Sequence, residues 1–238
     1  KGPLKPPNAW FFSPTLQAYN QTDEGPTYRV GFNIYKLDRP EPTGKVTQLT
    51  HFKDGFVADL RVSYDGRRIL FSRRGGAKDP WWHVFEMNAD GSGVRQITRG
   101  PYHDVQANYL PDGRFVFSTS RVGARDEYHG YPSTGLAVMN ADGSDIHCIG
   151  FNCGRDFEPV VNTDGRILFV RLEDFYSLPK LEFILESCLP DGTRAEVLYG
   201  PERRAFWAKH ISNKGSIGPQ SGRHRTVCVS QPQPLDGK

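Results

Sequence analysis

The chain has 238 residues, a formal net charge of +3 and 37% hydrophobic residues, enough to form a sizeable core. Its charges are dispersed, so no basic stripe indicates a nucleic-acid partner, and no run of about 18 apolar residues predicts a membrane span. Because the chain opens on Lys1 without Met or a signal peptide, we interpret it as a mature or excised segment.

The N-terminal part is predicted to be simple. Residues 1–29 should form an extended, Pro-rich arm and a first strand from Trp10 to Ala18, followed by a polar loop. Residues 30–238 should form the main domain. Its first strands are expected at residues 30–37 and 46–50, which match the last two strands of the repeating unit described next.

Three similar units follow, at residues 57–100, 104–150 and 156–200. Each has an Asp-Gly-Arg turn, beginning at Asp65, Asp112 and Asp164, and these turns recur after 47 and then 52 residues. A second Asp-Gly turn follows in each unit, at Asp90, Asp142 and Asp191. An Asp-Gly pair between β-branched or aromatic runs marks a hairpin. Each unit is therefore predicted to be four antiparallel strands, A to D, at residues 59–64, 67–73, 82–87 and 94–98 in the first unit.

Units of four strands at this period are typical of β-propeller blades. The fold class is therefore all-β: a β-propeller of four-stranded antiparallel blades, with three complete blades and two partial ones. The last partial blade is expected at residues 206–213 and 225–230, and little helix is expected. The two partial ends would either close a small ring or belong to a larger propeller, and we favour the larger propeller or a longer chain.

Blade geometry also predicts a working face. The A–B and C–D turns lie on one face and repeat almost unchanged, whereas the B–C and D–A loops lie on the other and vary in length. Variable loops on a rigid scaffold usually carry binding, and Trp, Tyr and Arg dominate interface hot spots. The candidate ligand- or partner-binding residues are Trp81, Trp82, Tyr102, His103, Asp104, Tyr128, His129, Tyr131, Arg155 and Asp156. The alternative is that these side chains cover the blade ends and pack on each other.

A second set of polar residues aligns near the axis. Asp59, Gln106 and Glu158 each lie six residues before the turn aspartate, so they are channel-lining candidates. They would form either a ring of acceptors for a cation or polar ligand, or hydrogen bonds between blades to backbone N–H groups. We favour the second interpretation, because buried polar groups need such partners in any case.

No catalytic constellation emerges. His103 and Asp104, with His129 and His210, would need to converge with other ligands to hold a metal. The sequence has no nucleophile elbow, phosphate-binding glycine loop or haem-attachment motif. We therefore assign no catalytic residue, metal or cofactor. The four cysteines are interpreted as buried thiols, although their even number permits a disulfide.

The blade motif, from Tyr64-Asp65-Gly66-Arg67 through Met87-Asn88-Ala89-Asp90-Gly91-Ser92 to Gln96-Ile97-Thr98, resembles the TolB-type, WD-like propeller repeat. Residues 62–72, Gly100-Pro101-Tyr102 and Gly222-Arg223-His224 resemble the propeller domain of bacterial proteins related to the hydrazine synthase alpha subunit. This second resemblance implies an exported protein, periplasmic or extracellular, with the propeller as a middle domain. Redox chemistry in that family belongs to c-type haems, and this segment lacks their attachment motif.

The sequence thus favours a non-catalytic scaffold that binds a partner protein or a neighbouring domain through the B–C/D–A face. Two alternatives stay open. One is an enzyme, a lyase or hydrolase, with a metal or small substrate in the central channel. The other is a propeller that gates a hydrolase domain elsewhere in a longer chain.

Overall fold

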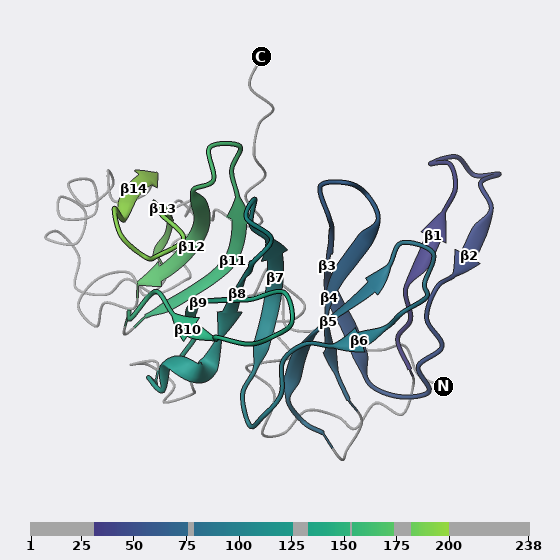
Figure 1. Cartoon of the computed structure of the whole chain (residues 1–238), viewed down its shortest axis with the longest axis horizontal. Coiled ribbons are helices and arrows are strands. Elements are labelled where there is room, and N and C mark those ends of the chain that lie inside the picture. The colour runs from purple at the N-terminus through teal and green to yellow at the C-terminus, as the bar shows by residue number, and fades with distance from the viewer. Residues whose placement is uncertain (1–30, 76–78, 126–132, 153, 174–181, 200–238) are drawn as a thin grey trace, which may run out of the picture.

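The computed structural model describes residues 31–75, 79–125, 133–152, 154–173 and 182–199. These residues form three four-stranded antiparallel sheets and one two-stranded sheet (Figure 1). The strands are β1 (Tyr35–Leu37), β2 (Val46–Gln48), β3 (Phe56–Val62), β4 (Arg68–Arg74), β5 (Trp82–Asn88), β6 (Arg95–Gln96), β7 (Asp104–Tyr109), β8 (Phe115–Thr119), β9 (Gly135–Met139), β10 (His147–Cys148), β11 (Arg155–Val161), β12 (Ile167–Glu173), β13 (Glu182–Cys188) and β14 (Glu196–Tyr199). One 3-10 turn, η1 (Ser120–Val122), follows β8, and the described part of the chain contains no α-helix.

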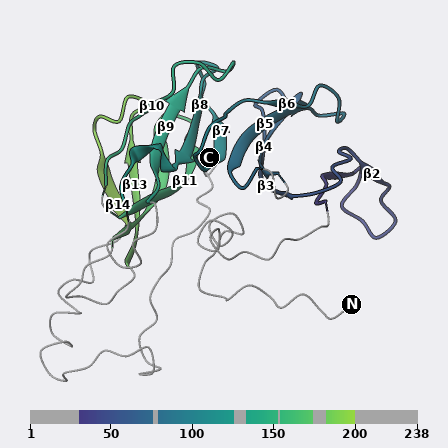
Figure 2. The same cartoon turned by 90° about the horizontal axis from the view of Figure 1, so that it is seen from below.

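Each four-stranded sheet is one blade with its strands in chain order. Blade 1 is β3-β4-β5-β6, blade 2 is β7-β8-β9-β10 and blade 3 is β11-β12-β13-β14. The first strand of blade 2, β7, lies against β3, β4 and β5, and β11 lies in the same way against β7, β8 and β9. Figure 2 shows the resulting fan of sheets, with β2 beyond blade 1. The predicted all-β propeller architecture is confirmed.

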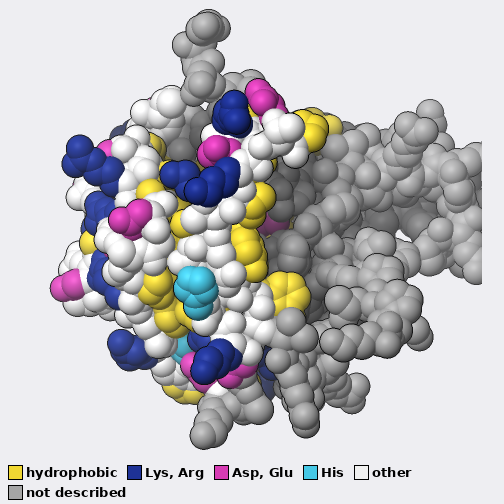
Figure 3. Space-filling model, turned by 90° about the vertical axis from the view of Figure 1, so that its right-hand side faces the viewer, with side chains coloured by type: hydrophobic (Ala, Val, Ile, Leu, Met, Phe, Trp, Pro, Cys, Tyr) yellow, Lys and Arg dark blue, Asp and Glu magenta, His cyan; other side chains and the backbone are white. Residues whose placement is uncertain are grey.

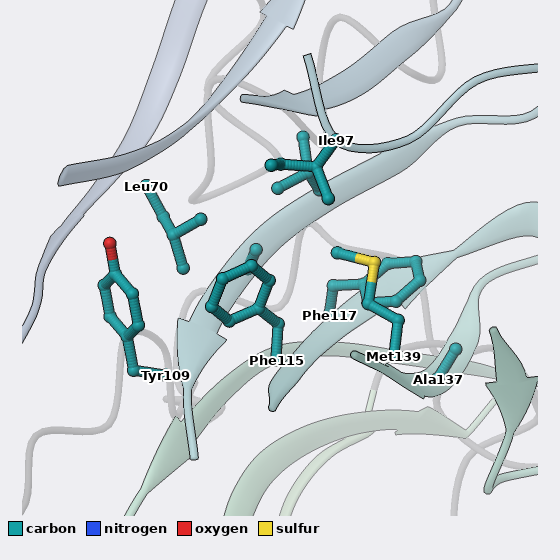
Figure 4. Packing of buried hydrophobic residues seen from close by; sticks show 9 residues of the cluster. Leu70, Ile97, Tyr109, Phe115, Phe117, Ala137 and Met139 are labelled. Carbon is teal, nitrogen blue, oxygen red and sulfur yellow. The ribbon is translucent and has the colours of Figure 1, made fainter. Parts of the chain in front are cut away.

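Hydrophobic layers hold neighbouring blades together. Between blades 1 and 2, Leu70 and Val84 pack against Tyr109, Phe115 and Phe117, which are at most 5% exposed (Figure 4). Alternate strand residues point to opposite faces of a sheet, so both faces of each middle strand can be buried in this way. Burying a large apolar side chain contributes about 1.5–3 kcal/mol. The blades are therefore stabilised mainly by their neighbours, as expected for stacked repeats.

The Asp-Gly turns differ in what surrounds them. The C–D turn of blade 2 lies so close to blade 1 that a Cβ on Gly143 would come 2.5 Å from the carbonyl oxygen of Ile97. The C–D turns of blades 1 and 3 meet the preceding sheet in the same way, through Gly91 and Gly192. A Cβ on Gly113, in an A–B turn, would have nothing within 4 Å. The C–D turns thus help to seat one blade on the next.

The innermost strand of each blade contains a β-bulge. The register with the second strand shifts between Ala58 and Arg61 in blade 1, and at the corresponding place in the other two. The residue in each bulge has a left-handed backbone: φ is 54° at Asp59, 58° at Gln106 and 54° at Glu158. An extra residue in one strand bends it and re-aims side chains. The three aligned polar positions are therefore bulge positions.

Strand boundaries differ from the prediction in two ways. The innermost strand of blade 1 begins at Phe56, three residues before the predicted start, and the outermost is only Arg95–Gln96. Among the described strands, β6 pairs with β5 only, so backbone hydrogen bonds from a second neighbouring strand do not fix its ends. The domain boundary expected at residue 29 and the last partial blade lie outside the described residues, as do Cys153 and Cys228. The two described cysteines, Cys148 and Cys188, are free.

Candidate partner-binding face

The B–C and D–A loops lie at the end of the blades opposite the Asp-Gly turns, because the strands of each sheet alternate in direction. Among the Phe, Tyr and Trp side chains in the described parts of the D–A loops before blades 2 and 3, two are exposed. Phe151, in the D–A loop before blade 3, is 80% exposed, and Tyr102, in the D–A loop before blade 2, is 36% exposed. The face therefore presents apolar surface at two neighbouring blades.

His103 joins the first two blades at this face. Its Nδ1 accepts a hydrogen bond from the backbone N–H of Trp82 at 3.3 Å, and its ring lies 4.9 Å from that of Trp81. Burial, together with the nearby positive charge of Arg74 and with His83, lowers the pKa of His103 to about 3. The imidazole is therefore neutral at physiological pH and serves as a structural acceptor.

Asp104 is the centre of a buried ion pair. Its carboxylate accepts from the hydroxyl of Thr119 at 2.6 Å and from two guanidinium nitrogens of Arg121 at 3.0 and 2.8 Å. The Asp104 side chain is fully buried, and Arg121 also donates to the carbonyl of Arg99. The guanidinium lies 4.4 Å from the centre of the Tyr102 ring. This arrangement fixes an exposed aromatic ring on a rigid, charge-paired base.

Blade 3 repeats the pair. Arg171 donates to both carboxylate oxygens of Asp156, at 2.7 and 3.0 Å, and contacts Glu186 at 2.8 Å. Asp156 also donates its backbone N–H to the carbonyl of Thr134 in blade 2. A bidentate pair of this kind is strong and geometrically specific. Asp104 and Asp156 thus tie strand ends together within and between blades.

The channel-lining candidates are arranged differently from an open ring of acceptors. Gln106 and Glu158 are 5% and 3% exposed, and Asp59 is half-buried. The backbone N–H of Gln106 donates to Ser72 of blade 1 at 3.0 Å. The Gln106 side-chain oxygen accepts from the hydroxyl of Ser118 and from the backbone N–H of Glu158 in blade 3, at 3.0 and 2.9 Å. Gln106 is therefore a hydrogen-bonded link across three blades.

The other candidate residues are either buried or outside the described ranges. Trp82 is 2% exposed and packs near Phe56, with ring centres 6.3 Å apart, so it lies inside blade 1. Arg155 is 2% exposed. Tyr128, His129 and Tyr131 lie outside the described residues. Within the described ranges, no group of three or more His, Cys, Asp or Glu side chains is arranged to hold a metal.

Sequence reasoning missed two features of this face. Arg121 was not among the candidate residues, yet it carries the Asp104 pair and the Tyr102 contact. An aspartate near the start of the innermost strand pairs with an arginine in both blades, from η1 at Arg121 and from β12 at Arg171. Phe151 had no signal beyond its place in a D–A loop.

Comparison with known proteins agrees with this architecture. No family model and no curated protein matches the chain. Solved structures do match. Hydrazine synthase from Kuenenia stuttgartiensis superposes with a TM-score of 0.58 at 22% identity, covering 67% of this chain and 27% of that one. A putative TolB from Agrobacterium tumefaciens gives 0.56 at 22% identity, covering 72% and 59%. A chain of the nidogen/laminin complex gives 0.53 at 11% identity, covering 71% and 59%.

The described residues form blades of a β-propeller. Hydrazine synthase and TolB are both β-propeller proteins, so the resemblance expected from the blade motif is confirmed at the level of the fold. The chain spans about a quarter of the hydrazine synthase chain and less than two thirds of the TolB chain. No helix in the described ranges is both long and apolar enough to cross a membrane.

Proposed function

We propose that this β-propeller is a non-catalytic scaffold that binds a partner protein or a neighbouring domain through its B–C/D–A face. The observation that carries the proposal is the exposure of Phe151 and Tyr102 on adjacent D–A loops of that face. Exposed aromatic rings on a rigid frame supply large contact area at low entropic cost. Aromatic residues are also the ones enriched at the energetic centres of interfaces.

The residues in contact with Tyr102 favour a binding role over a catalytic one. Tyr102 rests on Arg121, and the buried Asp104 holds that guanidinium in place. His103, the residue expected to pair with Asp104 in an acid–base or metal role, instead accepts a backbone hydrogen bond from Trp82. Both groups are thus occupied in the structural frame.

The charges of the face indicate the partner's chemistry. On the described part of this face, Arg73 is paired with Asp54 and Arg121 with Asp104, whereas Lys53 and Arg99 are exposed cations. A partner that places carboxylates around an apolar centre would complement this surface, and its association rate would fall with added salt. The protein–protein complex of the nidogen neighbour is consistent with such a role for the fold. Exported localisation, in a periplasmic or extracellular compartment, is part of the same proposal and rests on the TolB-type and hydrazine synthase-type resemblance.

The test compares two faces of one molecule. The variant Tyr102→Ala/Phe151→Ala removes both rings, and Val94→Ala removes a 41% exposed apolar side chain near a C–D turn on the opposite face. In pull-downs from the source cells, the double variant should recover the bound protein at least about tenfold less well, because hot-spot truncations cost about 2 kcal/mol or more each. The Val94→Ala variant should match the wild type, and both variants should melt with it.

Two results would argue against the proposal. One is full recovery of the bound protein by a correctly folded double variant. The other is a stoichiometric transition metal in the purified protein by elemental analysis, which would favour the alternative of an enzyme with a metal in its channel.

A further inference from the structure

The side of blade 1 that faces β1 and β2 leaves apolar side chains uncovered. Leu60 and Val62 of β3 are 44% and 60% exposed. The residues at the same positions of blade 2, Ala107 and Tyr109, are 2% and 5% exposed. Figure 3 views the end of the molecule that carries β1 and β2, where hydrophobic side chains form a broken band among charged ones. The difference between equivalent positions calls for a physical cause.

The cause lies in what covers the blade 2 residues. Ala107 and Tyr109 belong to a cluster with Leu70 of β4 and Val84 of β5, the second and third strands of blade 1. In the sheet before blade 1, the third and fourth strands are present as β1 and β2. Ile34 and Leu49 occupy the places that Val84 and Ile97 occupy in blade 1, and they pack on blade 1. The equivalent of β4 is not among the described strands.

Among the described strands, β1 pairs with β2 only, so its other edge has no described partner. Ile34 and Asp38 make backbone hydrogen bonds to the β2 side, at Leu49 and Lys45. In an antiparallel strand alternate residues bond to opposite sides. The backbone groups of Tyr35 and Leu37 therefore point away from β2. Their blade 1 equivalents, Phe85 and Met87, lie opposite Phe71 and Ile69 of β4.

We propose that residues 10–13 of this chain supply the missing second strand, pairing with the open edge of β1 and covering Leu60 and Val62. Trp10-Phe11-Phe12-Ser13 matches Ile69-Leu70-Phe71-Ser72 of β4 and Phe115-Val116-Phe117-Ser118 of β8. The segment precedes β1 in the chain, as β4 precedes β5. The residues between Ser13 and β1 then form the B–C loop, which already varies in length between blades.

The sequence match with β4 and β8 predicts the positions of Phe11 and Ser13. Phe11 takes the position of Leu70 and Val116, both 0% exposed, and fills the layer between the first sheet and blade 1. Ser13 takes the position of Ser72, whose hydroxyl accepts the backbone N–H of the bulge residue in the next blade. The bulge residue facing Ser13 is Asp59, which has the same left-handed backbone as Gln106.

The register makes the proposal testable by disulfide trapping. Leu70 lies opposite Glu86 in blade 1, which places Phe11 opposite Lys36. Phe11 and Lys36 would form a non-hydrogen-bonded pair of the antiparallel ladder. The Cα atoms of such a pair lie close together, within the range that a disulfide spans. The variant Phe11→Cys/Lys36→Cys should form an intramolecular bond on mild oxidation, identified by peptide mapping. The control Phe12→Cys/Lys36→Cys is shifted by one residue, which turns the side chain to the other face, and should not.

Hydrogen exchange on the wild-type chain gives a readout that needs no substitution in the core. The amides of Tyr35 and Leu37 should exchange about a hundredfold or more slowly than in a chain lacking residues 1–18, because only a paired edge protects them. Fast exchange of both amides in the intact chain would overturn the proposal. So would equal trapping by the shifted pair, or protection and disulfides that form between two chains and vanish on dilution, since a second copy would then be the occupant.

Discussion

The seating of one blade on the next can be tested at a pair of glycines with nearly the same backbone. Gly143 has φ 87° and Gly113 has φ 89°, so alanine is strained at both. The left-handed conformation costs about 1–2 kcal/mol for a residue with a Cβ, and alanine returns about 0.4–1 kcal/mol by restricting the unfolded chain. Gly113→Ala should therefore lower the free energy of unfolding by about 1 kcal/mol.

Gly143→Ala carries an added contact. Its Cβ would lie 2.5 Å from the carbonyl oxygen of Ile97, which is backbone and cannot rotate away. Overpacking of this kind costs about 1–3 kcal/mol. The total loss at Gly143 should reach about 2–4 kcal/mol, and the difference between the two variants isolates the contact between blades. Urea unfolding followed by tryptophan fluorescence measures both. Equal losses would show that the C–D turn does not support the neighbouring blade.

Three further predictions follow from burial and charge. Trp82→Ala should destabilise the fold by about 3–5 kcal/mol in urea unfolding; an unchanged midpoint would contradict its place in the core. Hydrogen bonds from the hydroxyl of Ser144 and, to a smaller extent, from its backbone N–H lower the pKa of Asp142 below 3.8. The ionised carboxylate therefore stabilises the fold above about pH 4, and this stabilisation is lost as the pH falls through the lowered pKa. Asp142→Asn should therefore lose less stability on acidification, and equal acid sensitivity would refute this. Burial, and next the charge of Asp156, raises the pKa of Cys188 to about 11, so iodoacetamide at pH 8 should label it about a hundredfold more slowly than in the unfolded chain, with equal rates as the contrary result.

The blades could be predicted from sequence because their signals are local. Asp-Gly turns between β-branched runs mark each hairpin, and the aspartate oxygens do accept N–H groups two residues on, as at Asp112 and Asp142. Strand ends were less predictable. The bulge at Gln106 adds a residue to the innermost strand, and the Gln106 backbone N–H donates to Ser72 of a different blade.

The candidate face was harder to predict because exposure depends on three-dimensional packing. Trp81 and Trp82 are adjacent in sequence, yet Trp82 begins β5 and is buried, whereas Trp81 is half-buried and lies against His103 with its ring tilted by 56°. The aligned position of Asp59, Gln106 and Glu158 was correctly identified as repeated. At Gln106 the side-chain oxygen accepts a backbone N–H of the next blade, and for Asp59 and Glu158 the favoured interpretation stays a prediction. The role of Arg121 depends on its contacts with Asp104 and Tyr102, which no local sequence pattern records.

Site-specific photo-cross-linking in the source cells shows directly which face of the propeller binds another protein or domain. One variant carries a benzophenone amino acid in place of Phe151, on the B–C/D–A face. A second variant of the same chain carries it in place of Val94, on the opposite face. We expect a discrete adduct with another protein or domain from position 151 and none from position 94. Adducts from position 94 alone, or equally from both positions, would contradict the proposal that this face is the one that binds.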